Sequence, residues 1–334
     1  MNLRHPFDDE NGDSLHEECG VFGAINAGSE ASTTTALGLH ALQHRGQEAA
    51  GITSFDGTQF YTRRGLGHVA ENFSSAESIA ELPGFMAVGH VRYSTTGGAG
   101  LRNVQPLYAD LASGGFAIAH NGNISNAATL REELVGKGAI FQSTSDTEVI
   151  IHLVATSRYP TMLDKLTDAL RLVEGAYALI VATPRGMAAC RDPLGIRPLQ
   201  MGRMGDAVVF ASETVAFDVV GAKFEREVEP GELIEVDFDG TIRSHRPFGD
   251  NPPRSFDELM EIMVQQMGQM QSLLNSMSPE QRQELFEAMN AAMDDAPEAE
   301  LAELAQNMAK LMPSQSDGEQ YPFFGGEELT LDQA

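Results

Sequence analysis

The stretch Glu17-Glu18-Cys19-Gly20-Val21-Phe22-Gly23 places a thiol at the head of an apolar run, and Cys19 is one of only two cysteines in 334 residues. The run continues to Ile25, and a short apolar segment of this length predicts a buried strand. A thiol at such a position is ordinarily a core residue. It becomes a nucleophile only if a base removes its proton, because a free cysteine is mostly protonated at neutral pH.

Two kinds of base are compatible with this cysteine. A histidine is the conventional choice, but the sequence does not mark any of the nine histidines as the partner. The other candidate is the α-amino group of Cys19 itself, because the pKa of an α-amino group, about 7.7–8.0, lies close to neutral pH. The second solution requires Cys19 to be the first residue. Residues 1–18, which are polar and acidic, would then be a leader that is removed after Glu18.

The hydrophobic pattern predicts an α+β chain, with strands towards both ends and helices between them. Ser32 is the expected N-cap of a helix over residues 33–43, and further helices are expected at 126–136, 146–156 and 161–172. Asp56-Gly57 predicts a tight hairpin, and Asn121-Gly122-Asn123 is expected to close the strand before it. The expected strands are 19–25, 50–55, 59–64, 85–91, 116–120, 176–182, 187–190, 199–201, 207–211, 233–236 and 241–245.

The composition argues against several classes of site and partner. A net charge of −26 argues against nucleic acid or an anionic membrane surface as a partner. Two cysteines cannot supply a four-thiolate zinc or iron–sulfur site, and we expect no metal and no cofactor. The first 18 residues hold no apolar run typical of a signal peptide, and no stretch approaches the ~20 apolar residues of a membrane span. We therefore expect a cytoplasmic protein.

The composition changes near residue 250. Residues 250–334 carry 17 acidic against three basic residues, together with nine of the 15 methionines and no histidine. Leucine, methionine and phenylalanine recur there at helical spacing, and Ser278-Pro279-Glu280-Gln281 is typical of a helix start. These features predict an acidic, all-helical, Met-rich tail that is distinct from residues 19–249.

Six motifs in chain order carry a resemblance to a known family. Residues 17–248 are similar to the class II glutamine amidotransferases, and among them to the amidophosphoribosyltransferases, to which Gln43–Glu48 and Asn103-Val104-Gln105-Pro106 point most directly. Sugar-amidating and asparagine-forming relatives carry a different motif at residues 43–48, so they fit less well. The six motifs are Cys19-Gly20-Val21-Phe22-Gly23, Gln43-His44-Arg45-Gly46-Gln47-Glu48, Gly89-His90-Val91-Arg92-Tyr93, His120-Asn121-Gly122-Asn123, Ser145-Asp146-Thr147-Glu148 and Asp192-Pro193-Leu194-Gly195-Ile196-Arg197-Pro198.

The resemblance implies an N-terminal-nucleophile hydrolase fold, an αββα sandwich of two antiparallel sheets. It also implies that Cys19 attacks the side-chain amide of glutamine to form a thioester, from which ammonia and then glutamate leave. Asn121 and the backbone N–H of Gly122 match the oxyanion hole. Taken alone, Asn121-Gly122 is equally typical of a plain turn.

The same resemblance assigns the groups that hold the substrate. Arg92 matches the residue that binds the α-carboxylate, Asp146 the residue that binds the α-ammonium, and the loop 95–100 the segment that closes over glutamine. Arg45 is expected to orient the nucleophile. The plainer alternatives are that Arg92 forms a surface ion pair and that Asp146 caps the helix that follows it. The family pattern gives His44, His90 and His120 no role as a base. Residues 192–198 are expected to form a structural turn, with Arg197 in an internal ion pair.

The resemblance ends near residue 248, where an amidophosphoribosyltransferase would continue into a domain that uses the ammonia. No strand followed by adjacent acids and a phosphate-binding loop is present in residues 250–334. We therefore expect glutamine hydrolysis, with ammonia passing to a separate subunit, and a homo-oligomer by resemblance. The alternative is a truncated or fused non-catalytic module that binds a partner through its helical tail.

Overall fold

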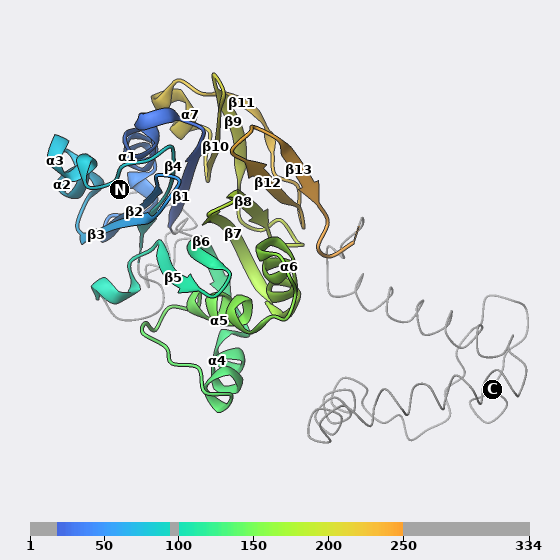
Figure 1. Cartoon of the computed structure of the whole chain (residues 1–334). Coiled ribbons are helices and arrows are strands. Elements are labelled where there is room, and N and C mark those ends of the chain that lie inside the picture. Colours follow the sequence, from blue (N-terminus) through green and yellow to red (C-terminus); the bar gives the residue numbers. More distant parts are fainter. Residues whose placement is uncertain (1–18, 94–99, 250–334) are drawn as a thin grey trace, which may run out of the picture. The chain divides into compact units, whose positions relative to one another are not determined.

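The computed structural model describes residues 19–93 and 100–249 (Figure 1). The predicted leader 1–18, most of the predicted closing loop 95–100, and the predicted helical tail 250–334 lie outside the described residues.

Two antiparallel sheets form the centre of the described region. The first has the strand order β11-β9-β10-β1-β4-β2-β3, and the second has the order β13-β12-β8-β7-β6-β5. The strands are β1 (Gly20–Ile25), β2 (Ala49–Phe55), β3 (Phe60–Leu66), β4 (Met86–Arg92), β5 (Leu107–Leu111), β6 (Gly114–Ile124), β7 (Gly175–Thr183), β8 (Gly186–Arg191), β9 (Gln200–Met204), β10 (Ala207–Ala211), β11 (Lys223–Glu227), β12 (Leu233–Asp237) and β13 (Ile242–His245).

The sheets pack face to face, and their inner faces form one apolar cluster. Val21 and Val88 from the first sheet join Ile180 and Ala119 from the second, and all four are essentially inaccessible to solvent. Full burial of one such aliphatic side chain contributes roughly 1.5–3 kcal/mol. This packing fixes β1 and β4 against β6, which is the arrangement that positions the candidate site.

Helices cover the two outer faces (Figure 1). On the first sheet, Leu39 of α1 packs with Phe22, and the helix approaches closely because Gly38 has no side chain; a Cβ there would lie 2.4 Å from the Phe22 ring. On the second sheet, the cluster includes Ile150 of α5 and Leu170 of α6. The helices are α1 (Ala31–Ala41), α2 (Val69–Phe73), α3 (Ala76–Ala80), α4 (Ala127–Gly136), α5 (Glu148–Thr156), α6 (Met162–Leu172) and α7 (Val215–Val220). The predicted αββα sandwich is therefore confirmed.

Several local predictions were wrong. Ser32 is not an N-cap: α1 begins at Ala31, and the buried Ser32 hydroxyl donates to the Leu82 carbonyl oxygen at 2.6 Å. The β2–β3 hairpin is confirmed, but four residues separate the strands rather than two, and the Asp56 carboxylate accepts the N–H groups of Thr58 and Gln59. The helices α2, α3 and α7 and the strands β5 and β11 were not predicted.

Candidate active site

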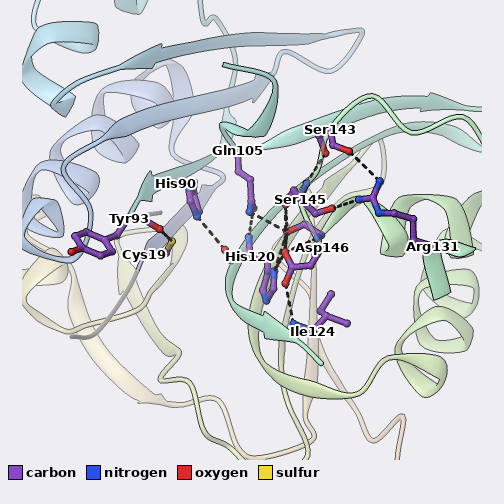
Figure 2. A network of polar contacts seen from close by, with 11 residues as sticks. Cys19, His90, Tyr93, Gln105, His120, Ile124, Arg131, Ser143, Ser145 and Asp146 are labelled. Atoms are coloured by element: carbon purple, nitrogen blue, oxygen red, sulfur yellow. Dashed lines mark hydrogen bonds and ion pairs between the residues drawn. The ribbon is translucent and has the colours of Figure 1, made fainter. Parts of the chain in front are cut away.

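Cys19 lies immediately before β1 in a conformation that is unusual for a residue with a side chain. Its φ is 62°, in the left-handed region. This backbone conformation costs a residue with a side chain about 1–3 kcal/mol of free energy, and it persists only where surrounding contacts enforce it. The Cys19 thiol is partly exposed and lies 3.5 Å from the carbonyl oxygen of Tyr93, to which it can donate (Figure 2).

Arg45 holds the cysteine backbone on both sides. The Cys19 N–H donates to the Arg45 carbonyl oxygen at 3.0 Å, and the Arg45 Nε donates to the Cys19 carbonyl oxygen at 2.7 Å. Arg45 is 1% exposed, and its guanidinium forms an ion pair with the Glu213 carboxylate. This geometry agrees with the orienting role that the resemblance implied for Arg45.

Asn121 and Gly122 lie inside β6, so the prediction that they end this strand was wrong. They pair with Ala178 and Tyr177 of β7. Asn121 is fully buried, yet neither its Nδ2 nor its Oδ1 has a hydrogen-bond partner among the described residues. An unsatisfied buried amide is costly and requires an explanation, of which a role in binding or catalysis is one.

Gly122 requires the absence of a side chain. Its φ is 144°, and a Cβ at this position would lie 2.0 Å from the Ala176 carbonyl oxygen. The backbone at Gly122 therefore follows a path that other residues cannot adopt. The constraint comes from the close approach of β7.

Arg92 is the last residue of β4 and is 7% exposed, so the alternative of a surface ion pair is wrong. The register pairs Gly20 with Val91, which places Arg92 beside the strand end that carries Cys19. Asp146 precedes α5, and its Oδ2 and Oδ1 accept the N–H groups of Ile124 at 2.9 Å and Thr147 at 2.8 Å. The α5 N-cap has no side-chain hydrogen bond, so the helix-capping alternative for Asp146 is also wrong.

A buried polar network runs from His90 on β4 through His120 and Thr147 to Asp146 (Figure 2). His90 Nε2 lies 3.1 Å from the His120 carbonyl oxygen, and His120 Nδ1 lies 3.0 Å from the Thr147 hydroxyl. Gln105 accepts the His120 N–H at 2.7 Å and donates to the Thr147 hydroxyl at 3.0 Å. These hydrogen bonds hold His120, which precedes Asn121, and Thr147, which follows Asp146.

The two buried histidines are neutral at pH 7. Burial, together with the neighbouring His120, lowers the pKa of His90 to about 3. Burial also lowers the pKa of His120, although Asp146 opposes the shift. Neither side chain can supply a proton at neutral pH, and a structural role fits both.

Other residues that the sequence singled out lie away from this chemistry. Cys190 is buried, and burial raises the pKa of its thiol far above the ordinary value. Asp192 forms the expected turn by accepting the N–H groups of Leu194 and Ile196. The ion pair at this turn joins Arg191 to Glu227, and Arg197 forms none among the described residues, so its predicted ion pair was wrong.

The structure describes residues 19–93 and 100–249. Within these ranges, no cluster of three or more histidine, cysteine or acidic side chains is arranged to hold a metal ion. No described helix combines the length and apolar character needed to cross a bilayer.

Comparison with known proteins agrees with this geometry. Residues 90–219 match the family model of the glutamine amidotransferase domain. Over 261 residues the chain is 52% identical to an amidophosphoribosyltransferase of Rhizobium etli, which covers 76% of this chain and 52% of the relative. A second amidophosphoribosyltransferase, from Bacillus subtilis, is 48% identical over 242 residues and covers 72% of this chain and 50% of the relative. This chain contains a glutamine amidotransferase domain that is similar to that of the amidophosphoribosyltransferases.

The solved structures place the fold in the same family. The glutamine phosphoribosylpyrophosphate (PRPP) amidotransferase from B. subtilis, complexed with ADP and GMP, aligns with a TM-score of 0.66 at 47% identity, over 71% of this chain and 50% of that one. A structure described as the allosteric regulatory enzyme of purine biosynthesis aligns with a TM-score of 0.67, also at 47% identity. The chain spans about half the length of the amidophosphoribosyltransferases it matches.

Proposed function

We propose that this domain hydrolyses glutamine to glutamate and ammonia through a thioester on Cys19. The observation that carries the proposal is the buried Asn121 amide, which has no hydrogen-bond partner among the described residues. Asn121 lies on β6, which packs against β1, the strand that directly follows Cys19. An amide donor left in this condition is suited to receive the negative charge that develops when a thiolate attacks a carboxamide.

The proposed reaction begins with removal of residues 1–18, which frees the α-amino group of Cys19. That amine takes the thiol proton, and the sulfur then forms a bond to the amide carbon of glutamine. The C–N bond breaks, and the protonated amine returns its proton to the departing ammonia. Water next attacks the thioester, releasing glutamate and the thiol. Nucleophile, base and oxyanion donors all come from the chain, so the chemistry proposed is complete without a metal or cofactor.

The remaining roles follow from the charges at the site. We propose that Arg92 binds the α-carboxylate of glutamine through its guanidinium fork and that Asp146 binds the α-ammonium. Asn121 and the Gly122 N–H stabilise the oxyanion. The backbone N–H groups of Ile124 and Thr147 donate to the Asp146 carboxylate and hold it in place.

The use of the ammonia is also a proposal. The relatives are amidophosphoribosyltransferases of about twice the matched length, and one similar structure is described as an enzyme of purine biosynthesis. We infer that ammonia from this domain serves amidation of a phosphoribosyl substrate by a partner subunit, in a cytoplasmic homo-oligomer.

The first experiment measures glutamate release from glutamine by the full chain and by Cys19→Ala. We expect the substitution to abolish release, whereas Cys190→Ala, at the buried thiol, should retain it. Intact-mass spectrometry should show that active material begins at Cys19. Equal glutamate release by Cys19→Ala, or activity in material that keeps residues before Cys19, would refute the mechanism.

A further inference from the structure

Glu213 is remote from Cys19 in sequence but joined to it through one side chain. It lies between β10 and α7, directly after Ser212. The Ser212 N–H donates to the Val21 carbonyl oxygen at 3.0 Å, and the Ser212 hydroxyl accepts the Val21 N–H at 3.0 Å. Both of these bonds fasten the segment to β1. The position of Glu213 is therefore fixed relative to the strand that Cys19 begins.

The Glu213 carboxylate is the counter-ion of a buried cation. Arg45 is 1% exposed, and its Nη1 donates to Glu213 Oε1. His44 Nε2 approaches the same carboxylate at 3.1 Å. Burial opposes ionisation of Glu213, but the hydrogen bonds from Arg45 and His44 prevail and lower its pKa below the ordinary value. Glu213 is thus ionised at neutral pH and balances the charge of Arg45.

The same guanidinium that Glu213 holds also holds Cys19. Its Nε donates to the Cys19 carbonyl oxygen at 2.7 Å, while the Arg45 carbonyl oxygen accepts the Cys19 N–H at 3.0 Å. These two bonds oppose the strain of the left-handed cysteine, whose φ is 62°. When the leader is removed, the nitrogen held by Arg45 becomes the free amine that the proposed function uses as its base.

We propose that Glu213 is a positioning residue for glutamine hydrolysis, which holds the Arg45 guanidinium so that Arg45 fixes the backbone of Cys19 and aligns its amine with its thiol. The inference rests on the proposed function. Glu213 contacts neither the thiol nor the groups assigned to glutamine, so it acts through Arg45. A nucleophile displaced by about 1 Å can lose on the order of 10²-fold in rate.

The main test compares steady-state kinetics of glutamine hydrolysis by Glu213→Gln and by Glu225→Gln. Glu225 pairs with Arg203 at 3.0 Å on the surface, so it offers the same substitution in an ion pair away from the site. We expect Glu213→Gln to lower kcat by about 10–100-fold with KM within about twofold, and Glu225→Gln to behave as wild type. Glu213→Asp, which keeps the charge, should recover part of the loss. A kcat for Glu213→Gln equal to that of Glu225→Gln, or an effect confined to KM, overturns the proposal.

A double substitution separates action through Arg45 from general loss of structure. Arg45→Ala with Glu213→Ala should be no slower than Arg45→Ala alone, because the two side chains then act as one unit. Multiplicative losses overturn the proposal.

A readout that does not need turnover distinguishes failure of this inference from failure of the proposed function. The rate of Cys19 alkylation by iodoacetamide, followed from pH 6 to 9 by peptide mass spectrometry, reports the alignment of amine and thiol. We expect Glu213→Gln to slow alkylation at neutral pH and to move its profile to higher pH, at an unfolding midpoint that shows a folded sample. An unchanged profile overturns the inference even if the wild-type chain hydrolyses no glutamine.

Discussion

The polar residues of the candidate site fall into two groups that differ in how their hydrogen bonds are satisfied. Arg45 and Asp146 are tied to backbone groups of their neighbours, whereas the amide atoms of Asn121 have no partner among the described residues. These hydrogen bonds fix the side chains of Arg45 and Asp146 in one orientation. We propose that Asn121 receives the charge that develops only during the reaction.

Replacing Asn121 by alanine should affect catalysis and spare stability. Loss of one oxyanion donor typically costs about 2.7–4 kcal/mol of transition-state stabilisation, so we expect kcat to fall by about 10²–10³-fold with little change in KM. Because neither amide atom is bonded to a described residue, the free energy of unfolding should fall by much less than for a bonded buried amide. Steady-state kinetics and urea unfolding measure the two effects. A large loss of stability with intact kcat would contradict the assignment.

The residues of the candidate site were predictable where they stand in local motifs. Cys19, Arg45 and Asn121 were each singled out by their neighbours in sequence. Glu213 was missed, and Gln105 and Thr147, which stand in quoted motifs, were assigned no role, because each acts through a partner distant in the chain: Glu213 is 168 residues from Arg45, and Gln105 is 42 from Thr147. A single glutamate after a strand has no pattern that reveals a pairing created by the tertiary fold.

At the level of elements, β6 shows how the site depends on a long strand. The apolar pattern predicted a strand over 116–120, but the strand runs from Gly114 to Ile124 because β7 pairs with it as far as Gly175. The polar residues Asn121 and Asn123 hide this extension in the sequence, since they are typical of turns. The short helices α2 and α3, of five residues each, were missed for a related reason: they are too short to show a helical period.

The β6–β7 pairing predicts a large effect of Gly122→Ala. The added Cβ would meet the Ala176 carbonyl oxygen at 2.0 Å in a backbone conformation that alanine rarely adopts, so the strands must separate locally. We expect the free energy of unfolding to fall by about 3 kcal/mol or more, with loss of glutamine hydrolysis.

Gly205→Ala provides the matched control. Gly205 has a φ of 60°, but no atom lies within 4 Å of the added Cβ, so only the backbone strain remains. That strain should cost about 1–2 kcal/mol. Equal loss of stability for the two variants in urea unfolding would show that the approach to β7 is not the constraint on Gly122.

At the level of the whole molecule, the two sheets enclose a buried histidine pair. His90 on β4 of the first sheet meets the backbone of His120 on β6 of the second, and both are 2% exposed or less. The pattern of strands and helices predicted the two sheets and the helical layers. It could not predict that two titratable side chains lie between them, because burial depends on how the sheets pack.

This pair makes the fold sensitive to mild acid. The pKa of His90 falls from 6.5 in the unfolded chain to about 3 in the folded protein, so between these values the unfolded state binds the extra proton. Stability from this group is therefore complete above pH 6.5 and declines as the pH falls towards 3. The expected loss for His90 is about 2 kcal/mol between pH 7 and pH 5, and His120 shifts in the same direction. The pKa of Glu232 is lowered to about 2, so this group reduces the free energy of unfolding only below about pH 4.5.

Urea unfolding at pH 7 and pH 5 tests the contribution of His90. His90→Gln keeps a donor for the His120 carbonyl oxygen but cannot take up a proton, so the stability difference between the two pH values should shrink by about 2 kcal/mol. His40→Gln makes the same change at an exposed position of α1 and serves as the control. If His90→Gln retains the full wild-type pH dependence, the proton taken up on unfolding at pH 5 belongs to another group. The histidine between the sheets would then not be the source of acid sensitivity.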